Sequence, residues 1–338
     1  LSNIKIAVDA MGGENSPKKV IDGILENFKQ NKDVVYNIFG DQDKIKSLLP
    51  NNYNKEIFNI TDTKNKILDT DSPLSAAKKG KDTSMWLTIQ SVKNNESDVA
   101  ISAGNTGALF VISKLNLRMI ENIDKPALSA LWPNKKNFNV VLDLGANIEC
   151  NDKNLVDFSI MGSSLFKSLY PKDNPEVALL NVGSEELKGN EIIKKAYQNL
   201  QNNKNKNFNF HGYVEGNQIM DGKINVIVTD GFTGNIALKT AEGTANFIMN
   251  EFRNSMTSNV LGKISSLINI KNLKKVKKKL DPRLYNGAIL IGLDKPVVKS
   301  HGSTDYVGFS HSLNMCIKII KNNLIKKIKD NIIKWELT

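Results

Sequence analysis

The chain has 338 residues and a formal net charge of +11, with 46 lysines and arginines against 35 aspartates and glutamates. Hydrophobic residues make up 40% of it, and no apolar run approaches the roughly 20 residues of a membrane-spanning helix. This composition excludes a disordered chain and a helical membrane protein. A strand-like segment begins within four residues of the start and leaves no room for a signal peptide, so we expect a cytoplasmic globular protein.

The positive charge is carried almost entirely by lysine. Only Arg118, Arg253 and Arg283 are arginines. Proteins that bind nucleic acids usually rely on arginine for bidentate contacts to phosphates and guanines, so we expect no nucleic-acid partner. A surface of this charge still attracts acidic partners.

Strand-like and helix-like segments alternate along the chain. We expect strands at residues 4–10, 34–40, 99–103, 140–144, 177–182, 225–229, 288–292 and 296–299, and helices at 17–30, 41–49, 81–94, 106–117, 155–169, 191–200, 235–252 and from about 304 onward. This alternation predicts an α/β protein with a mostly parallel sheet between two helical layers, a three-layer α/β/α fold. Without a repeat or a clear linker, residues 1–338 are expected to form a single domain.

Residues 255–280 differ from the rest of the chain. Apolar residues recur there at helical spacing, namely Val260, Leu261, Ile264, Leu267, Ile268, Leu273, Val276 and Leu280. Lysines crowd the second half, namely Lys271, Lys274, Lys275, Lys277, Lys278 and Lys279. The pattern predicts an inserted, projecting amphipathic helical hairpin. It is either a solvated face over a core helix or a surface for an anionic membrane or an acidic protein.

Several common catalytic motifs are absent. The sequence contains no GxxxxGK[ST], GxGxxG, HExxH or GxSxG. Cys150 and Cys316 match neither a metal-ligand spacing nor a disulfide framework. We therefore expect no cofactor, no metal ion and no enzyme nucleophile.

Six glycine-rich junctions stand at predicted strand ends, at residues 7–14, 102–109, 143–147, 181–190, 229–239 and 298–305. Glycine allows close backbone approach, and the free N–H groups of a first helical turn bind anions. The candidate phosphate-binding residues are Gly12, Gly13, Asn105, Thr106, Asn147, Ser184, Asp230, Thr233 and Ser303. Any one of the polar residues could instead be an ordinary helix cap. Because ligands of open α/β sheets bind at the carboxyl ends of strands, the six junctions together predict an anion-binding crevice.

The motifs AVDAMGG, SAGNTGAL, NVGSEELKGN, TDGFTGNIALK and VKSHGSTD, in this order, resemble the PlsX-type phosphate acyltransferase family of bacterial phospholipid synthesis. The resemblance covers nearly the whole chain from about Ile4. It implies transfer of a fatty acyl group from acyl carrier protein to inorganic phosphate. It also implies a fold similar to phosphate acetyltransferases and isopropylmalate dehydrogenases, a homodimer, and peripheral membrane contact near the glycerol-phosphate acyltransferase that uses acyl phosphate. The sequence departs from the family pattern at Glu14, Lys78, Lys125 and Asn286, which affects only local anion geometry.

Such a reaction needs no enzyme nucleophile, because phosphate can attack the activated thioester directly. The protein must bind phosphate, align it and stabilise the oxyanion. The catalytic candidates are Lys188 as a cation, Asn235 as a donor to phosphate or oxyanion, Lys299 as a holder of anionic charge, and His301 as a donor of a hydrogen bond or proton. The alternatives are a surface lysine, a helix cap, a strand-edge lysine and a structural histidine. Two other functions stay open: a short-chain phosphotransacetylase using acyl-CoA, and a non-catalytic phosphate- or nucleotide-binding module.

Overall fold

The computed structural model describes residues 3–170, 174–204, 206–259, 264–265, 267–279 and 281–337. Of the predicted hairpin, Val260, Leu261 and Leu280 lie outside the described residues, as do the side chains of Lys274, Val276, Lys277, Lys278 and Lys279.

Within the described residues, eleven strands form one sheet in the order β3-β2-β1-β4-β11-β10-β5-β6-β9-β7-β8. The strands are β1 (Ile4–Asp9), β2 (Val34–Gly40), β3 (Phe58–Asp62), β4 (Val99–Ser102), β5 (Ala127–Pro133), β6 (Phe138–Leu142), β7 (Glu176–Leu180), β8 (Asn209–Val214), β9 (Val226–Val228), β10 (Ala288–Ile291) and β11 (Val297–Lys299). The helices are α1 (Lys18–Gln30), α2 (Gln42–Leu48), α3 (Pro73–Lys79), α4 (Ser84–Lys93), α5 (Thr106–Asn116), α6 (Asp152–Leu169), α7 (Glu191–Asn202), α8 (Gly231–Thr257), α10 (Ile270–Lys279), α11 (Tyr306–Lys321) and α12 (Leu324–Glu336), with short 3₁₀ helices η1 (Gly216–Asp221) and η2 (Pro282–Tyr285).

The sheet reverses direction in its middle. Strands β3, β2, β1, β4 and β11 run parallel to one another, and so do β6, β9, β7 and β8. Between these halves, β10 and β5 pair antiparallel with both of their neighbours. The two parallel halves therefore run in opposite directions within one sheet. The sequence-based prediction of a mostly parallel sheet is confirmed.

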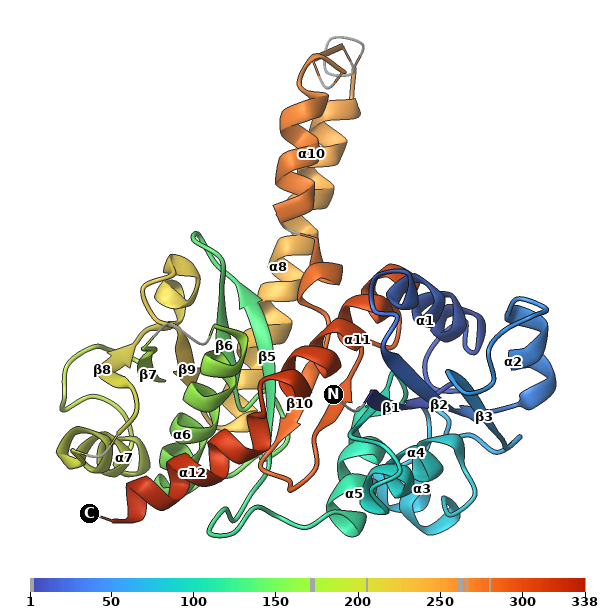
Figure 1. Ribbon diagram of the computed structural model, residues 1–338. Coiled ribbons are helices and arrows are strands. Elements are labelled where there is room, and N and C mark those ends of the chain that lie inside the picture. Colours follow the sequence, from blue (N-terminus) through green and yellow to red (C-terminus); the bar gives the residue numbers. More distant parts are fainter. Residues whose placement is uncertain are drawn as a thin grey trace.

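Helices cover both faces of this sheet (Figure 1). Alternate residues of β1 enter different cores: Ile6 and Val8 pack in a cluster with residues of α1, α6, α11 and α12, whereas Ala7 packs with residues of α4 and α5. A third cluster places Ala237, Leu238 and Ala241 of α8 against the second half-sheet. This arrangement is the predicted three-layer α/β/α fold.

Figure 1 shows α8 and α10 side by side, projecting far from the body of the protein. Within α8 only Gly231 and Gly234 are buried. The predicted hairpin is present, but its first leg is not a separate helix, because α8 continues without a break from the sheet to Thr257. At the base of the hairpin, Arg283 forms ion pairs with Asp281 at 2.6 Å and with Asp305, the N-cap of α11, at 2.9 Å. No helix in the described part of the chain is long and apolar enough to span a membrane.

Candidate functional site

Three of the glycine-rich junctions meet where β1, β4 and β11 end. The backbone N–H of Glu14 donates to the carbonyl of Gly302 at 3.0 Å, and the N–H of Ser300 donates to the carbonyl of Ser102 at 2.9 Å. These links join segments that are about 200 to 300 residues apart in the sequence. We call this region the lysine site, defined by Gly12, Gly13, Lys19, Lys299 and Gly302.

Two lysine ammonium groups define this site. Lys19 is only 5% exposed, and its Nζ donates to the carbonyl of Gly302 at 2.6 Å. The Nζ of Lys299 donates to the carbonyl of Ser300 and, at 3.4 Å, to that of Ala103. Among the described residues, neither lysine has a carboxylate within the 4.0 Å of an ion pair. A buried cation held only by carbonyl dipoles is poorly compensated, so the site favours an anion.

The pKa of each of the two lysines is lowered, and burial is the main cause in both. Burial lowers the pKa of Lys19, although the charges of Glu14 and Asp69 partly oppose it. Burial, and then the neighbouring charge of Lys19, lowers the pKa of Lys299 to about 8. The charge of Lys19 thus disfavours the protonated form of Lys299, and an anion bound between them would oppose that effect.

The turn after β1 has the geometry that only glycine allows. Gly13 has a φ of +81°, and a Cβ there would lie 2.8 to 2.9 Å from the carbonyls of Ala103 and Gly302 and from the Nζ of Lys19. Buried Asp9 fixes this turn: its carboxylate accepts from the hydroxyl of Ser102 at 2.6 Å and from the N–H of Met11 at 3.1 Å. Burial raises the pKa of Asp9. Gly13 therefore keeps the backbone close enough for Lys19 to face the glycine-rich wall.

His301 lies beside the lysine site on an exposed turn. Its Nδ1 is 3.0 Å from the Oγ of Ser303, and its backbone N–H donates to the side chain of Asn286 at 2.9 Å. Partial burial of its ring, together with the nearby charge of Lys299, lowers the pKa of His301 below its usual 6.5. The imidazole is therefore mostly neutral at pH 7 and can donate or accept a hydrogen bond.

A second group of junctions follows β6 and β9. The carboxylate of buried Asp143 accepts the backbone N–H groups of Leu128, Gly145, Ala146 and Asn147, and burial raises its pKa. The side-chain amide of Asn147 donates to the carbonyl of Pro126 and to Asp143, so its N–H groups are occupied. These contacts organise the loop around Gly145.

The start of α8 completes the second group. Asp230 caps α8 by accepting from both the N–H and the hydroxyl of Thr233 at 2.8 Å. Asn235 does not act as a cap, because its amide donates to the carbonyl of Leu144 at 3.2 Å and ties α8 to the loop after β6. The alternative interpretation as a helix cap therefore holds for Asp230 and does not hold for Asn235.

The remaining predicted residues are placed differently. Asn105 caps α5 and donates to the carbonyls of Asp69 and Asp71, whereas Thr106 is exposed at the first turn of that helix. Ser184 and Lys188 are exposed on the loop after β7, where the N–H of Lys188 donates to the carbonyl of Glu185. That loop lies beyond β9 in the strand order, so it is the candidate segment farthest from the lysine site across the sheet.

The sheet reversal brings the two groups toward each other. Lys299 lies opposite Ala288 on the neighbouring strand β10. When the residue pairing is followed from β10 to β5 and from β5 to β6, the residue at the same height on β6 is Val141. Strands β11 and β6 thus end within one residue of the same level, three strand spacings or about 14 Å apart. Helix α8 connects the groups, since Asp230 caps its start and the charges of its Lys239 and Glu242 act on the pKa of His301.

Sequence reasoning missed Lys19, although a signal was present. Lys19, Gly23 and Asn27 are spaced by four residues and form part of the buried face of α1. A lysine on a buried helical stripe just after a glycine-rich turn needs a polar partner, and this pattern is readable without a structure.

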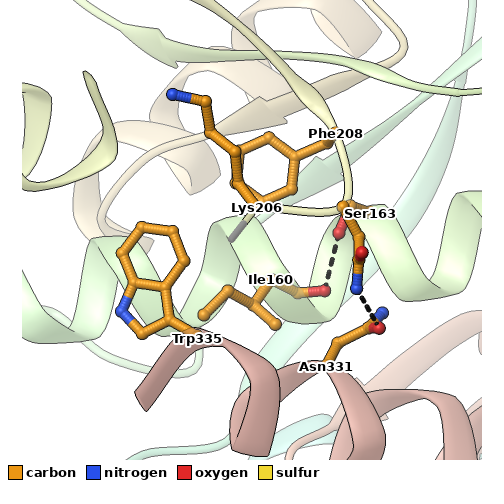
Figure 2. Close-up of a pocket in the computed structure, with 7 residues that line it drawn as sticks. Ile160, Ser163, Lys206, Phe208, Asn331 and Trp335 are labelled. Carbon is orange, nitrogen blue, oxygen red and sulfur yellow. Dashed lines mark hydrogen bonds between the residues drawn. The ribbon is translucent and has the colours of Figure 1, made fainter. Parts of the chain in front are cut away.

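A separate hollow lies between α6, α12 and the segment before β8, and no residue of the glycine-rich junctions lines it. Figure 2 shows the side chains of Ile160, Phe208 and Trp335 filling it, with Ser163 and Asn331 engaged in hydrogen bonds. The amine of Lys206 donates to the last carbonyls of α7, at Leu200 and Gln201. The hollow has no room for a water molecule, so it is a packing junction. No group of three or more potential metal ligands occurs in the described part of the chain.

Solved structures share this fold. A phosphotransacetylase from Streptococcus pyogenes superposes with a TM-score of 0.60 at 14% identity, covering 96% of this chain and 94% of that one. A phosphotransacetylase from Staphylococcus aureus gives a TM-score of 0.58 at 15% identity. At these identities the likeness defines the fold class, a three-layer α/β/α architecture.

Sequence relatives define the family. A family model described as "Fatty acid synthesis protein" matches residues 4–327. A protein of Pelagibacter ubique named phosphate acyltransferase is 68% identical over 329 residues, covering 97% of this chain and 98% of that protein. Another of the same name, from Rhodospirillum rubrum, is 41% identical over 337 residues, covering 99% and 96%. The chain belongs to the phosphate acyltransferase family and is an acyltransferase.

Proposed function

We propose that this protein transfers a fatty acyl group from acyl carrier protein to inorganic phosphate, and that the acyl phosphate feeds phospholipid synthesis. The observation that carries the proposal is the lysine site, in which Lys19 and Lys299 converge without a carboxylate partner in the described residues. The names of the relatives support phosphate as the acceptor.

The reaction follows from these groups. Phosphate binds to the ammonium groups of Lys19 and Lys299, and one of its oxygens attacks the thioester carbonyl. A bond forms between the phosphate oxygen and the carbonyl carbon, and the carbon–sulfur bond breaks. The thiolate leaves with little acid assistance, because a free thiol has a pKa of about 8.5. Holding phosphate and thioester together lowers the barrier, because the reacting groups no longer have to meet by diffusion.

The developing oxyanion needs a hydrogen-bond donor. His301 is the candidate beside the lysine site, since its neutral ring can present an N–H once Ser303 orients the other nitrogen. Asn235 and Lys188, on the second half-sheet, are the candidates for contacts to the donor thioester and to anionic charge. The remaining candidates for phosphate binding are proposed only from their place in the glycine-rich junctions; they are Gly12, Asn105, Thr106, Ser184 and Thr233.

The direct test is product formation. Long-chain acyl carrier protein and phosphate are incubated with the protein, and acyl phosphate and free carrier protein are measured, with acetyl-CoA as the competing donor. We expect Lys188→Ala and His301→Ala to lower turnover by about 10- to 1,000-fold. Lys326→Ala, at an exposed position on α12, is the matched control. Faster turnover of acetyl-CoA than of acyl carrier protein would instead establish a short-chain phosphotransacetylase.

We further propose that the protein is cytoplasmic and that its hairpin contacts an anionic membrane near the glycerol-phosphate acyltransferase. Ile264, Leu267 and Ile268 are 48 to 77% exposed there, and exposed Lys271 and Lys275 follow on α10. Lysines near an anionic surface contribute about 1 kcal/mol each. Two variants test this contact: Leu261→Ser/Ile264→Ser, and one in which Lys274, Lys275, Lys277 and Lys278 are replaced by glutamate. Each should lose flotation with anionic vesicles and keep its turnover of acyl carrier protein in solution. Flotation that persists in both variants contradicts this proposal.

A homodimer is the last part of the proposal. Exposed apolar side chains continue along α8, with Phe247 66%, Ile248 57% and Phe252 49% exposed. A second copy of the chain would bury this stripe. Sedimentation of the wild-type protein should show a dimer, and Phe247→Ser and Phe252→Ser should shift it to monomers. A wild-type monomer at micromolar concentration would contradict the homodimer.

A further inference from the structure

A hollow of about 440 Å³ opens beside the lysine site, between residues 63–72 and α3. It is lined by Lys64, Asn65, Lys66, Ile67, Leu68, Asp71, Ala76 and Thr83. Ile67 and Ala76 are buried in the apolar cluster of α4 and α5, so the floor is apolar. Leu68 is 49% exposed and presents an apolar wall to solvent.

The loop that forms this hollow is fixed at both ends. The hydroxyl of Thr63 donates to the carbonyl of Asp82 at 2.6 Å, and the N–H of Ser84 donates to the carbonyl of Asn65 at 3.0 Å. A hollow held open by such contacts takes a ligand without an ordering cost.

Two lysines line the hollow, and two more lie close to its lining residues in the sequence. Lys64 and Lys66 stand in its wall, and Lys78 and Lys81 follow at the end of α3; all four are exposed. None of them forms an ion pair within the part of the chain that the structure describes. We call this surface, comprising the hollow and these four lysines, the α3 face.

The α3 face also carries carboxylates. Asp71 lines the hollow and accepts from the N–H of Leu68 at 2.8 Å. Asp41 pairs with Lys44 at 3.1 Å, and the charge of Lys64 helps to lower its pKa. The charge of Asp69 acts on the pKa of Lys19 and Lys299. Residues 63–83 contain five lysines and three aspartates, so the face keeps a net positive charge around an apolar floor.

The α3 face is continuous with the lysine site. The amide of Asn105 donates to the carbonyls of Asp69 at 3.1 Å and Asp71 at 3.0 Å, so the junction after β4 and the loop of the hollow form one wall. The charge of Asp69 reaches both lysines of the site. A ligand in the hollow would therefore lie on the same wall as the anion proposed for the lysine site.

We propose that the α3 face docks the acidic protein carrier of the acyl group, with its thioester-bearing arm in the hollow and its acidic surface against Lys64, Lys66, Lys78 and Lys81. This proposal rests on the proposed function, because it assumes a protein-borne acyl donor. Positive charge around a hollow with an apolar floor matches a flexible arm that carries an apolar acyl chain on an anionic protein.

The test is a charge reversal with a matched control. Lys64→Glu/Lys66→Glu should raise the KM for acyl carrier protein about tenfold, because charges at the rim of an interface govern association. The kcat and the KM for phosphate should stay within about twofold, and the KM for a free acyl-pantetheine thioester should not change. Lys326→Glu/Lys329→Glu, exposed on α12 and equal in charge, should leave every constant unchanged. Leu68→Ser should raise the KM for both donors.

The outcomes separate this proposal from the proposed function. If the wild-type protein forms no acyl phosphate from acyl carrier protein, the proposed function fails. If it does, but Lys64→Glu/Lys66→Glu keeps the wild-type KM for the carrier, the α3 face is not the dock. An increase caused by Lys271→Glu/Lys275→Glu alone would place the dock on the hairpin and overturn the proposal. Thermal unfolding confirms that each variant is folded.

Discussion

Lys299 offers the sharpest test of the lysine site, because its pKa is lowered to about 8 by burial and by the charge of Lys19. Below pH 8 the ammonium form predominates and attracts phosphate, and above pH 8 the neutral amine does not. If the charged form is required, the apparent KM for phosphate scales with 1 + 10^(pH − pKa), a rise of about tenfold between pH 7 and pH 9. Lys299→Arg should flatten this rise, since a guanidinium stays protonated over the whole range.

The assay is initial rate against phosphate concentration at saturating donor, from pH 6.5 to pH 9.5. Lys299→Met serves as the control: its KM should be high at every pH and should lack the rise above pH 8. The slope is the readout, because arginine also changes the geometry and can raise the KM uniformly. A Lys299→Arg enzyme with the wild-type pH profile would refute the reasoning and assign the ionisation to another group.

The same pKa has a consequence for stability. The lysine binds its proton less tightly in the folded than in the unfolded chain, so the free energy of unfolding should rise with pH from about 8 to the ordinary lysine value of 10.5. Thermal unfolding without phosphate measures that rise. Gly13→Ala should lower kcat/KM at least tenfold. An alanine in the left-handed backbone conformation costs about 1–2 kcal/mol, and its Cβ would collide with Lys19. Wild-type kinetics would show that the turn relaxes freely. Cys150→Ala and Cys316→Ala should keep their activity, since burial raises the pKa of Cys150 to about 11 and also raises that of Cys316; an acyl-enzyme thioester trapped on either thiol would exclude direct attack. Dialysis against a strong chelator should leave turnover intact, and a loss restored by a divalent metal would contradict the mechanism.

Local patterns predicted most of the elements but not how the sheet is assembled. The strands with continuous apolar runs, such as 34–40 and 99–103, were predicted because a strand covered on both faces has that composition. Strands β3, β5 and β8 were missed. In β3 only the first residue is buried, in β5 buried and partly exposed residues largely alternate, and in β8 only the last three residues are buried, so none carries a continuous apolar signal. The predicted long C-terminal helix is interrupted at Asn323, whose φ of +52° ends α11 before α12 begins.

The site was predictable in parts. The glycine-rich junctions pointed to Gly12, Gly13, Lys299 and His301, which lie together because β1 and β11 flank β4. The reversal of the sheet at β10 and β5 was not predictable, because it depends on where strands late in the sequence insert. For that reason the six junctions form two groups rather than one edge.

The strand order also has a consequence for how the chain folds. Strands β10 and β11 are the last two to be synthesised, yet they lie between β4 and β5 in the middle of the sheet. Until residues 288–299 leave the ribosome, each half-sheet exposes an unpaired edge to other chains. Pairing β11 with β4 also closes a loop of almost two hundred residues, which is slow. The strand that carries Lys299 thus both completes the lysine site and seals the sheet, so a nascent or truncated chain lacking it would be prone to aggregate as well as inactive.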